Sequence, residues 1–312
     1  MERLEYDEYG GPEVVQLRAF TLGQPKAAEV LVRVAFASVN PMDWKIRKGE
    51  MKMFTGSHFP RAMGTDFSGV VEKVGEAVTR FKPGDEVLGT VTMKDSGAFA
   101  PMLITAENRL VKKPASVSFA EAASLPIVGV TAWQALVKIA GLTSGQKVFI
   151  SGAMGGVGMA AVRIAQEMRA DVVARVGPQS LAEAQAKGIL SVLDYSKPLP
   201  DSLRRSFDVV FDCNGGLTIK EGDWLISKGG VVIDIVPSPQ KFLKAFFSKS
   251  RKVLISDPRA ENLQPVVDLA ATGKLTIPLK QSVALSDAPS VLAALEHAKG
   301  NKGKTVITFP DN

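Results

Sequence analysis

The chain has 312 residues, which is long for one hydrophobic core and fits two domains. Its single cysteine, Cys213, excludes a disulfide framework and indicates a reducing compartment, so we expect a cytoplasmic protein. The net charge of +6 is modest, and no aromatic-basic RNA-binding pattern accompanies it, so we expect no nucleic acid partner.

The first third of the chain, residues 1 to about 118, alternates short β-like runs with turn signals. Its start, Met1–Glu5, is charged and lacks the apolar core of a signal peptide. Turn residues such as Gly10-Gly11-Pro12 and Lys82-Pro83-Gly84-Asp85 separate the runs. This pattern predicts a mostly antiparallel β domain with strands at Val14–Leu17, Glu29–Ala37, Ser68–Val74, Glu86–Val91 and Ala98–Ile104.

From about Phe119 the pattern changes to alternating strands and helices. The longest apolar stretch, Ala120–Gly141, carries Glu121 and Lys138, which favours a buried helix pair over a membrane span, and we expect no membrane partner. The alternation is typical of a doubly wound parallel sheet. Its six strands are predicted at 147–150, 171–175, 190–193, 207–212, 229–235 and 252–256.

The last segment predicts a helix over Ala288–Ala298 and a closing strand over Lys304–Phe309. That strand has no place in the parallel sheet, so we expect it to return to the β domain. The expected division is residues 1–118 with 276–312 for the β domain, and 119–275 for the parallel-sheet domain.

A glycine-rich turn follows the strand that begins at Lys147. Small residues let the backbone approach a pyrophosphate, and the helix N-terminus supplies free N–H groups and a partial positive charge. The spacing is close to the dinucleotide-binding fingerprint, although Ala153 stands where the first glycine would be. The cofactor-binding turn is therefore predicted at Ala153, Met154, Gly155, Gly156, Val157 and Gly158.

The next strand ends in Arg175, where a chain that prefers NAD usually places an acidic residue for the ribose 2′-hydroxyl. A guanidinium can instead meet a 2′-phosphate with charge-assisted hydrogen bonds, each about 1.5–3 kcal/mol. We therefore expect NADPH rather than NADH. The alternative is that Arg175 is a solvated charge at a strand end and that cofactor choice is made elsewhere.

Several ordered motifs resemble the medium-chain dehydrogenase/reductase superfamily, and within it the zinc-independent quinone oxidoreductase branch that includes zeta-crystallin. The resemblance runs nearly end to end. It implies a GroES-like catalytic domain and a Rossmann domain that binds NADPH, with a cleft between them. It rests on Tyr9–Val14, Ser38–Gly49, Gly64–Val71 with Val74-Gly75 and Gly84–Val87, Ala122–Ala132 and Gly303–Val306.

The resemblance also indicates which metal chemistry is missing. Zinc alcohol dehydrogenases of this superfamily use cysteine and histidine as ligands, whereas this chain has one cysteine and two histidines, His58 and His297. Where those enzymes have Gly-His-Glu, this chain has Gly64-Thr65-Asp66. We expect no metal. Hydride transfer to an already electron-poor carbon then needs orientation, a dry pocket and hydrogen-bond donors for the carbonyl oxygen.

The candidate catalytic residues are Asn40, which the resemblance implies, and Asp43 and Tyr9, which lie in motifs that carry the resemblance. The family's matching asparagine lies beside the nicotinamide and substrate, although Asn40 precedes Pro41 and could only cap a turn. Asp43 could hold a substrate or pair with Lys45. Tyr9 could donate a proton or be an ordinary half-buried tyrosine.

On the cofactor side the resemblance implies five further positions. Thr131 is similar to the family's threonine near the nicotinamide, and Tyr195 to a tyrosine that approaches the adenosine phosphate. Ser180 lies in the expected phosphate loop, and Asn214 and Gly215 follow the switch-point strand. One departure is that relatives commonly have a serine- or threonine-rich strand end with a lysine or asparagine, where this chain has Arg175-Val176-Gly177-Pro178-Gln179-Ser180.

The segment Lys241–Lys252 interleaves aromatic and basic residues at helical spacing. It could line a substrate channel, touch a membrane surface or receive an acyl carrier's phosphates. The position favours an apolar pocket wall with a solvated basic face.

These observations predict a zinc-free, NADPH-dependent oxidoreductase that transfers hydride to quinones or α,β-unsaturated carbonyls, its partner a small electrophilic molecule. The alternatives are a reductase of an enoyl thioester or a biosynthetic intermediate, and a non-catalytic NADPH-binding redox sensor. The relatives' common state favours a homodimer.

Overall fold

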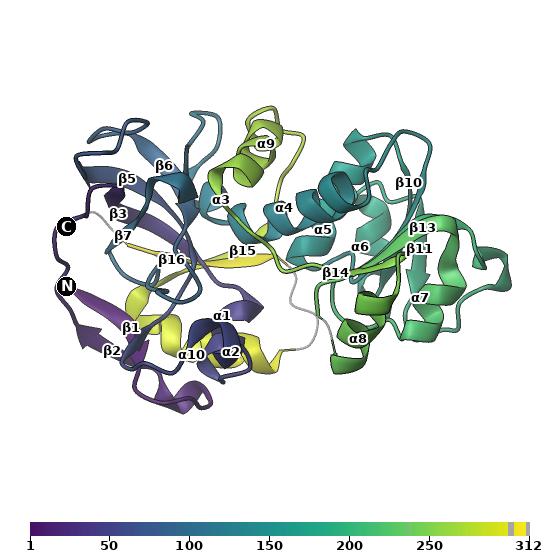
Figure 1. Ribbon diagram of the computed structural model, residues 1–312, viewed down its shortest axis with the longest axis horizontal. Coiled ribbons are helices and arrows are strands. Elements are labelled where there is room, and N and C mark those ends of the chain that lie inside the picture. The colour runs from purple at the N-terminus through teal and green to yellow at the C-terminus, as the bar shows by residue number, and fades with distance from the viewer. Residues whose placement is uncertain (237, 299–302, 310–312) are drawn as a thin grey trace. The chain divides into compact units, whose positions relative to one another are not determined.

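The computed structural model describes residues 1–236, 238–298 and 303–309. The chain divides into two compact units. The β-rich unit comprises Met1–Ile127, Pro258–Thr272 and Ile277–Asn312, and the parallel-sheet unit comprises Val128–Asp257 and Gly273–Thr276. Both are mixtures of strands and helices (Figure 1).

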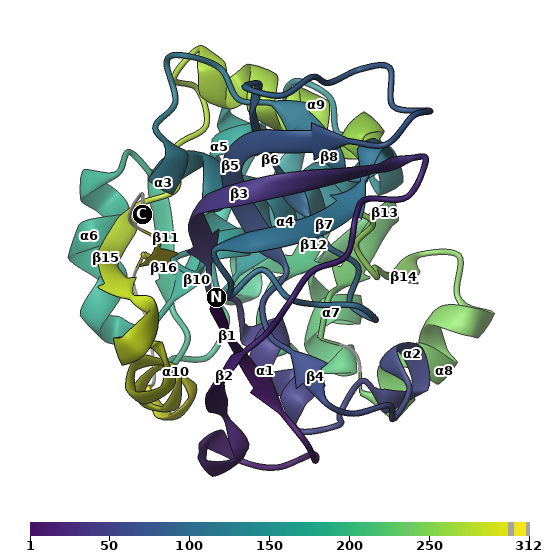
Figure 2. The same ribbon diagram turned by 90° about the vertical axis from the view of Figure 1, so that its left-hand side faces the viewer.

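The β-rich unit contains two sheets. A seven-stranded sheet has the order β15-β16-β3-β5-β6-β8, with β7 paired to β3, and a three-stranded sheet has the order β2-β1-β4. Figure 2 shows β3, β5, β6 and β8 side by side. The strands are β1 (Glu2–Tyr6), β2 (Gln16–Ala19), β3 (Glu29–Ser38), β4 (Arg61–Ala62), β5 (Asp66–Val74), β6 (Glu86–Thr90), β7 (Met102–Ala106), β8 (Leu110–Lys112), β15 (Leu279–Ala284) and β16 (Lys304–Thr308).

Alternating burial along β3 places Val30, Val32 and Val34 in the core of this unit. Helix α1 is held to α10 by an ion pair between the fully buried Arg47 and Glu296, 2.5 Å apart. The helical segments are η1 (Pro12–Val14), α1 (Pro41–Arg47), α2 (Lys52–Thr55), η2 (Glu107–Arg109), α3 (Phe119–Ala123), α9 (Ala260–Ala271), η6 (Leu285–Asp287) and α10 (Ala288–His297).

The parallel-sheet unit is built on a six-stranded sheet of order β11-β10-β9-β12-β13-β14. Every adjacent pair is parallel, which confirms the predicted doubly wound architecture. The strands are β9 (Lys147–Ser151), β10 (Asp171–Val176), β11 (Ser191–Asp194), β12 (Phe207–Asp212), β13 (Ile226–Asp234) and β14 (Arg251–Val253).

Because helices cover both faces of this sheet, its central strands read as continuous apolar runs. Val148, Phe149 and Ile150 of β9 are all fully buried. Helices α5 and α6 contact β9, β10 and β11, whereas α7 contacts β12 and β13. The helical segments are α4 (Pro126–Trp133, which starts in the β-rich unit), the π-helical η3 (Gln134–Ile139), α5 (Gly156–Glu167), η4 (Pro178–Ser180), α6 (Leu181–Ala186), η5 (Asp201–Leu203), α7 (Ile219–Leu225) and α8 (Pro239–Phe247).

The closing strand returns to the β-rich unit, as the sequence predicts. Strand β16 pairs antiparallel with β3, with Val306 opposite Ser38. The sequence pattern missed β1, β4, β8 and β15. Two predicted strands also start late: β2 begins at Gln16 because Pro12–Val14 forms a 3-10 turn, and β7 begins at Met102.

The residues before β7 form hydrogen bonds with β1 and with the residue that follows β4, and not with a neighbouring ladder. The Phe99 amide donates to the Met63 carbonyl, and the Phe99 carbonyl accepts from Leu4. Packing groups residues 119–127 and α9 with the β-rich unit, so the contact-defined units differ from the division expected at residues 118 and 276. The domain boundaries themselves stay a prediction.

Within the described ranges, no helix has both the length and the apolar character needed to cross a membrane.

Candidate active site

The glycine-rich turn joins β9 to α5 at the carboxyl end of the parallel sheet. Gly158 is required by the packing of this turn, since a Cβ there would lie 2.2 Å from the Gly152 carbonyl oxygen. Gly152 itself has φ +74°, and a Cβ on it would lie 2.9 Å from the Asn214 side chain. Ala153 is fully buried. The turn therefore brings backbone unusually close to the start of α5.

The first turn of α5 has no side-chain cap. Helices α3, α7 and α8 are each capped by a hydroxyl, from Ser118, Thr218 and Ser238. Helices α6, α9 and α10 start without a side-chain cap hydrogen bond, as α5 does. In α5 the N-cap is Gly155, which has no side chain to offer and directly follows the small-residue turn. Unfilled N–H donors beside a small-residue turn fit the diphosphate of a nicotinamide dinucleotide. Gly156, Val157 and Gly158 would hold it there, and Met154 lies in the same turn.

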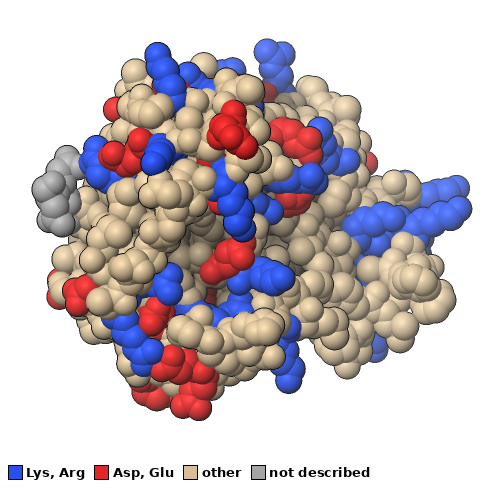
Figure 3. All heavy atoms as spheres, turned by 60° about the vertical axis from the view of Figure 1, so that its left-hand side comes forward, with Lys and Arg blue, Asp and Glu red and all other residues tan. Residues whose placement is uncertain are grey.

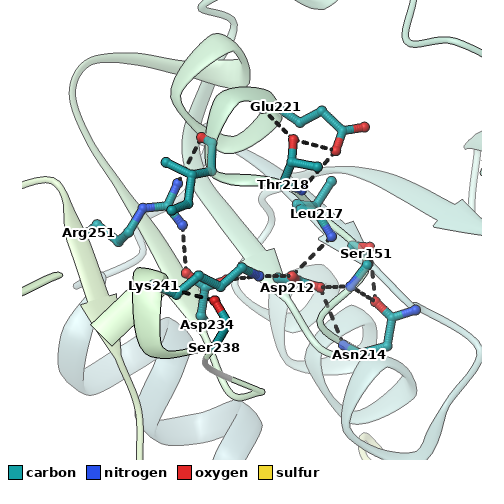
Figure 4. Close-up of polar contacts among 12 residues, drawn as sticks. Ser151, Asp212, Asn214, Leu217, Thr218, Glu221, Asp234, Ser238, Lys241 and Arg251 are labelled. Carbon is teal, nitrogen blue, oxygen red and sulfur yellow. Dashed lines mark hydrogen bonds and ion pairs between the residues drawn. The ribbon is translucent and has the colours of Figure 1, made fainter. Parts of the chain in front are cut away.

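The two loops at the switch point of the sheet are joined by a hydrogen bond. Ser151, the last residue of β9, donates its hydroxyl to Asn214 Oδ1 at 3.2 Å (Figure 4). Fully buried Asp212 organises the loop after β12 by accepting the amides of Gly216 and Leu217 at 3.2 and 3.1 Å. Gly215 has φ +76° in this loop. Ligands of open parallel sheets bind in the crevice at this point, and both predicted loops meet there.

Arg175 is paired within the protein. Its Nη1 donates to Glu221 Oε1 at 3.0 Å and its Nη2 to the Tyr195 carbonyl at 3.3 Å, while its buried Nε has no partner. Partial burial acts to raise the pKa of Glu221, but hydrogen bonds from Thr218 and Arg175 outweigh it and lower that pKa. Glu221 is therefore an anion, and a 2′-phosphate on Arg175 would compete with it.

The other predicted cofactor residues of this unit differ in exposure. Tyr195 is 56% exposed, whereas Ser180 and Thr131 are buried. Thr131 lies in α4 and Ser180 ends η4. Their predicted contacts with the cofactor stay predictions.

In the β-rich unit, Asn40 starts α1 and is 1% exposed. Its backbone N–H donates to Asp43 Oδ2 at 2.7 Å, three residues later, so Asp43 closes the first turn. Asp43 is buried, which excludes the solvated ion pair with Lys45 that the sequence left open.

The Asn40 amide is fully engaged. Its Nδ2 donates to Asp66 Oδ2 at 3.0 Å and, over 3.4 Å, to the Ser38 carbonyl. Its Oδ1 accepts from Lys304 Nζ at 2.6 Å, and the same ammonium donates to the Val39 carbonyl at 2.7 Å. Asn40 would have to release one of these partners before it could donate to a substrate oxygen.

Sequence reasoning missed Lys304 and Asp66 as partners of Asn40. Both lie in motifs that carry the resemblance, Gly303–Val306 and Gly64–Val71, but neither motif says which side chain it contacts. Pairing of β16 with β3 brings Lys304 to Asn40, and pairing of β3 with β5 brings Asp66 there.

Burial shifts the pKa of all three ionisable groups in this cluster. It raises the pKa of Asp43 to about 7 and that of Asp66 to about 6. It lowers the pKa of Lys304 to about 8. Both carboxylates feel the charge of the one ammonium, but desolvation is the largest cause of each shift and favours the neutral form of each group.

Tyr9 is engaged outside this cluster. Its hydroxyl donates to the Gly56 carbonyl, and its ring packs edge-on against Phe59 with 5.0 Å between centroids. This fits the half-buried tyrosine that the sequence left open, while a role as proton donor is untested.

No group of three potential metal ligands (His, Cys, Asp or Glu) occurs among the described residues. His58 is exposed, and His297 Nδ1 lies 2.8 Å from the Ala293 carbonyl oxygen. Burial raises the pKa of the Cys213 thiol, which disfavours a thiolate ligand.

Comparison with known proteins identifies both parts of the chain. Residues 26–115 match the alcohol dehydrogenase GroES-like domain, and residues 188–307 match the zinc-binding dehydrogenase family. These matches and the sheet order define a two-domain dehydrogenase of the medium-chain dehydrogenase/reductase superfamily.

Relatives narrow the assignment. The chloroplast envelope quinone oxidoreductase homolog of Arabidopsis thaliana is 36% identical, and the alignment covers 94% of each chain. The chloroplastic NADPH-dependent alkenal/one oxidoreductase of the same plant is 32% identical over 86% of this chain and 72% of its own. The quinone oxidoreductase structure from Coxiella burnetii superimposes with a TM-score of 0.88 at 26% identity, covering 99% of both chains. The chain belongs to the quinone oxidoreductase family, and it is an oxidoreductase that uses a nicotinamide cofactor.

Proposed function

We propose that this protein transfers hydride from NADPH to quinones or α,β-unsaturated carbonyls, without zinc. The observation that carries the proposal is the uncapped start of α5 beside the joined loops of Ser151 and Asn214. The names of the relatives support the acceptor class, since they include quinone oxidoreductases and an alkenal/one oxidoreductase.

The bound cofactor supplies the hydride. The residues of the chain would bind and orient it: the amides of Gly156–Gly158 would hold the diphosphate, and Asn214 and Gly215 would lie near the nicotinamide ribose. An acceptor that is already electron-poor places its developing charge on a carbonyl oxygen, so one or two donors suffice to stabilise it. Asn40 is our candidate for such a donor, with Lys304 and Asp66 setting the orientation of its amide.

The test of the activity is consumption of NADPH with a panel of quinones, enals, enones and enoyl thioesters. Saturable, acceptor-dependent loss of absorbance by reduced nicotinamide is expected with the first three. Turnover of enoyl thioesters alone would support the biosynthetic alternative. Binding of NADPH without turnover of any acceptor would support the redox sensor.

We propose NADPH over NADH because β10 ends in Arg175 and not in an acid. Arg175→Ala should raise the dissociation constant for NADPH about tenfold, through loss of one charge-assisted contact, and leave that for NADH unchanged. Quenching of tryptophan fluorescence measures both. Arg204→Ala, an exposed arginine of the same unit, is the control.

An equal loss of affinity for both cofactors would show that Arg175 does not bind the 2′-phosphate. It would instead leave the Arg175–Glu221 ion pair as a purely structural contact.

We also propose that the protein is a cytoplasmic homodimer. β14 is an edge strand, so one side of its backbone is open to pair with a second copy. Sedimentation equilibrium should give twice the chain mass of 33.3 kDa, and a single-chain mass would contradict the proposal.

A further inference from the structure

Helix α8 buries a charged side chain and exposes apolar ones, which is the reverse of an ordinary surface helix. Its nine residues place Lys241 inward, 5% exposed, and four large apolar side chains outward. Phe242 is 45% exposed, Leu243 63%, Phe246 83% and Phe247 78%. A surface helix normally buries its apolar stripe and presents its charges to water.

Buried ions explain the reversal. Lys241 Nζ donates to Asp212 at 2.8 Å and to Asp234 at 2.6 Å, and both carboxylates are fully buried at the ends of their strands (Figure 4). Burial acts to lower the pKa of Lys241, but these two bonds outweigh it and raise that pKa. The inward position of α8 is therefore fixed by ion pairs, and its apolar residues face out.

The apolar face is held in shape. Phe242 and Phe246, and Leu243 and Phe247, are spaced four residues apart and so lie on one side of the helix. The rings of Phe246 and Phe247 also pack edge-on, 5.2 Å between centroids. Ser238 caps the helix start by accepting from the Lys241 amide. The exposed face belongs to a formed helix anchored by charge.

Cations surround this face. Lys244, Lys249 and Lys252 are exposed, and the sequence carries no acid from Ser238 to Ser256. Lys244 lies 3.7 Å from Asp223, but no described carboxylate pairs with Lys249 or Lys252. In Figure 2, α8 lies at the right-hand edge, and the corresponding side of Figure 3 carries blue side chains beside an uncharged surface.

We propose that α8 docks on an anionic lipid surface, inserting Phe242, Leu243, Phe246 and Phe247 at the level of the headgroups. An interfacial helix combines a protruding apolar face with flanking lysines, and both features are present. Each lysine near an anionic bilayer contributes about fivefold in affinity. The sequence alone favoured a pocket wall and no membrane partner, and the exposure of all four side chains changes that interpretation.

Two other partners for the apolar face of α8, a second copy of the chain and an acidic protein, fit it less well than a bilayer does. A second copy packed helix to helix on α8 would bring Lys244 and Lys249 of both copies together, because the two surfaces of a twofold interface are identical. An acidic protein would satisfy the lysines but would need a groove deep enough for four adjacent apolar side chains. A bilayer interface accommodates them without a preformed shape.

The test is co-sedimentation of the full chain with vesicles of phosphatidylcholine, with and without phosphatidylserine. Binding to the anionic vesicles should be at least tenfold tighter and should weaken with salt. Phe246→Ser with Phe247→Ser should lower it at least tenfold, and Lys249→Glu with Lys252→Glu should do the same. Leu190→Ser, a 96% exposed apolar residue of the same unit, is the matched control and should bind as the parent does.

Equal sedimentation with both vesicle types, or unchanged binding by either double variant, would overturn the proposal. So would a dimer that the phenylalanine variant abolishes, since it would assign the face to a second copy. Circular dichroism and NADPH titration of each variant separate this result from loss of fold or of the proposed function.

Discussion

Each unit of the molecule contains a buried ionic cluster, and the two clusters differ in how many cations accompany their carboxylates. The anchor cluster comprises Asp212, Asp234, Lys241 and Arg251 in the parallel-sheet unit, with two carboxylates and two cations. The core cluster comprises Asn40, Asp43, Asp66 and Lys304 in the β-rich unit, with two carboxylates and one cation.

The difference in balance decides how the groups titrate. In the anchor cluster, direct ion pairs at 2.6–2.8 Å outweigh desolvation, and the pKa of Lys241 rises. In the core cluster, the ammonium bonds to an amide and a carbonyl, so desolvation dominates and the pKa values converge on 6 to 8. Direct ion pairs therefore favour the charged form of Lys241, whereas burial favours the neutral form of Asp43 and Asp66.

Removal of one cation from the anchor cluster should have the largest effect on stability. Lys241→Met leaves Asp212 and Asp234 with one cation between them, and we expect a loss of about 3–5 kcal/mol in unfolding free energy. Urea denaturation measures it. Lys244→Met, on the same helix but half-exposed, should cost less than about 0.5 kcal/mol.

A loss below about 1 kcal/mol for Lys241→Met would mean that the anchor cluster is not tightly paired. The comparison between the two clusters would then fail.

Removal of the excess carboxylate from the core cluster should change the pH dependence. Because the folded pKa of Asp43 is about 7, above its unfolded value of 3.8, its stabilising contribution is present at low pH and is lost as pH rises through 7. Asp43→Asn removes that loss and can still accept the Asn40 N–H. Relative to the parent, this variant should gain about 2–3 kcal/mol between pH 5 and pH 8.

Asp85→Asn is the control for this experiment. Partial desolvation acts to raise the pKa of Asp85, but hydrogen bonds from Lys82 and Lys112 outweigh it and lower that pKa. Its contribution is therefore lost only at acid pH, and the difference from the parent should be flat between pH 5 and pH 8. A flat result for Asp43→Asn as well would show that Asp43 ionises freely.

The smallest effect is expected at the edge of the anchor cluster. Asp223 accepts from Arg251 at 3.2 Å, but its side chain is 42% exposed, so solvent screens the pair. Asp223→Asn should cost less than about 1 kcal/mol by urea denaturation. A cost near that of Lys241→Met would show that Arg251 depends on this outer partner.

The architecture of the molecule followed from local patterns. Alternating strands and helices predicted the parallel sheet, and the glycine-rich turn at Gly155–Gly158 predicted the junction between a strand and a helix. The isolated strand at Lys304 predicted its return to the β-rich unit. Each of these depends on periodicity or on backbone freedom, which neighbouring residues display.

The ionic clusters could not be predicted in this way. Lys304 and Asn40 are 264 residues apart, and no spacing rule connects them. The sequence of α8 shows a clear helical periodicity. Which side of the helix faces inward, however, depends on Asp212 and Asp234, which lie at the ends of two other elements. The direction of the Arg175 side chain could not be predicted for the same reason, because its partner Glu221 lies 46 residues away in the sequence.

Strand β16 has a consequence for the making of the protein. The β-rich unit takes its last sheet strand, and the ammonium that holds Asn40, from residues 304–308, after the whole parallel-sheet unit has been synthesised. While the chain is being synthesised, the parallel-sheet unit can therefore fold first. Until residues 304–308 emerge, the β-rich unit lacks the strand that pairs with β3 and the ammonium that bonds to Asn40. The half of the protein that is translated first is thus the half that matures last.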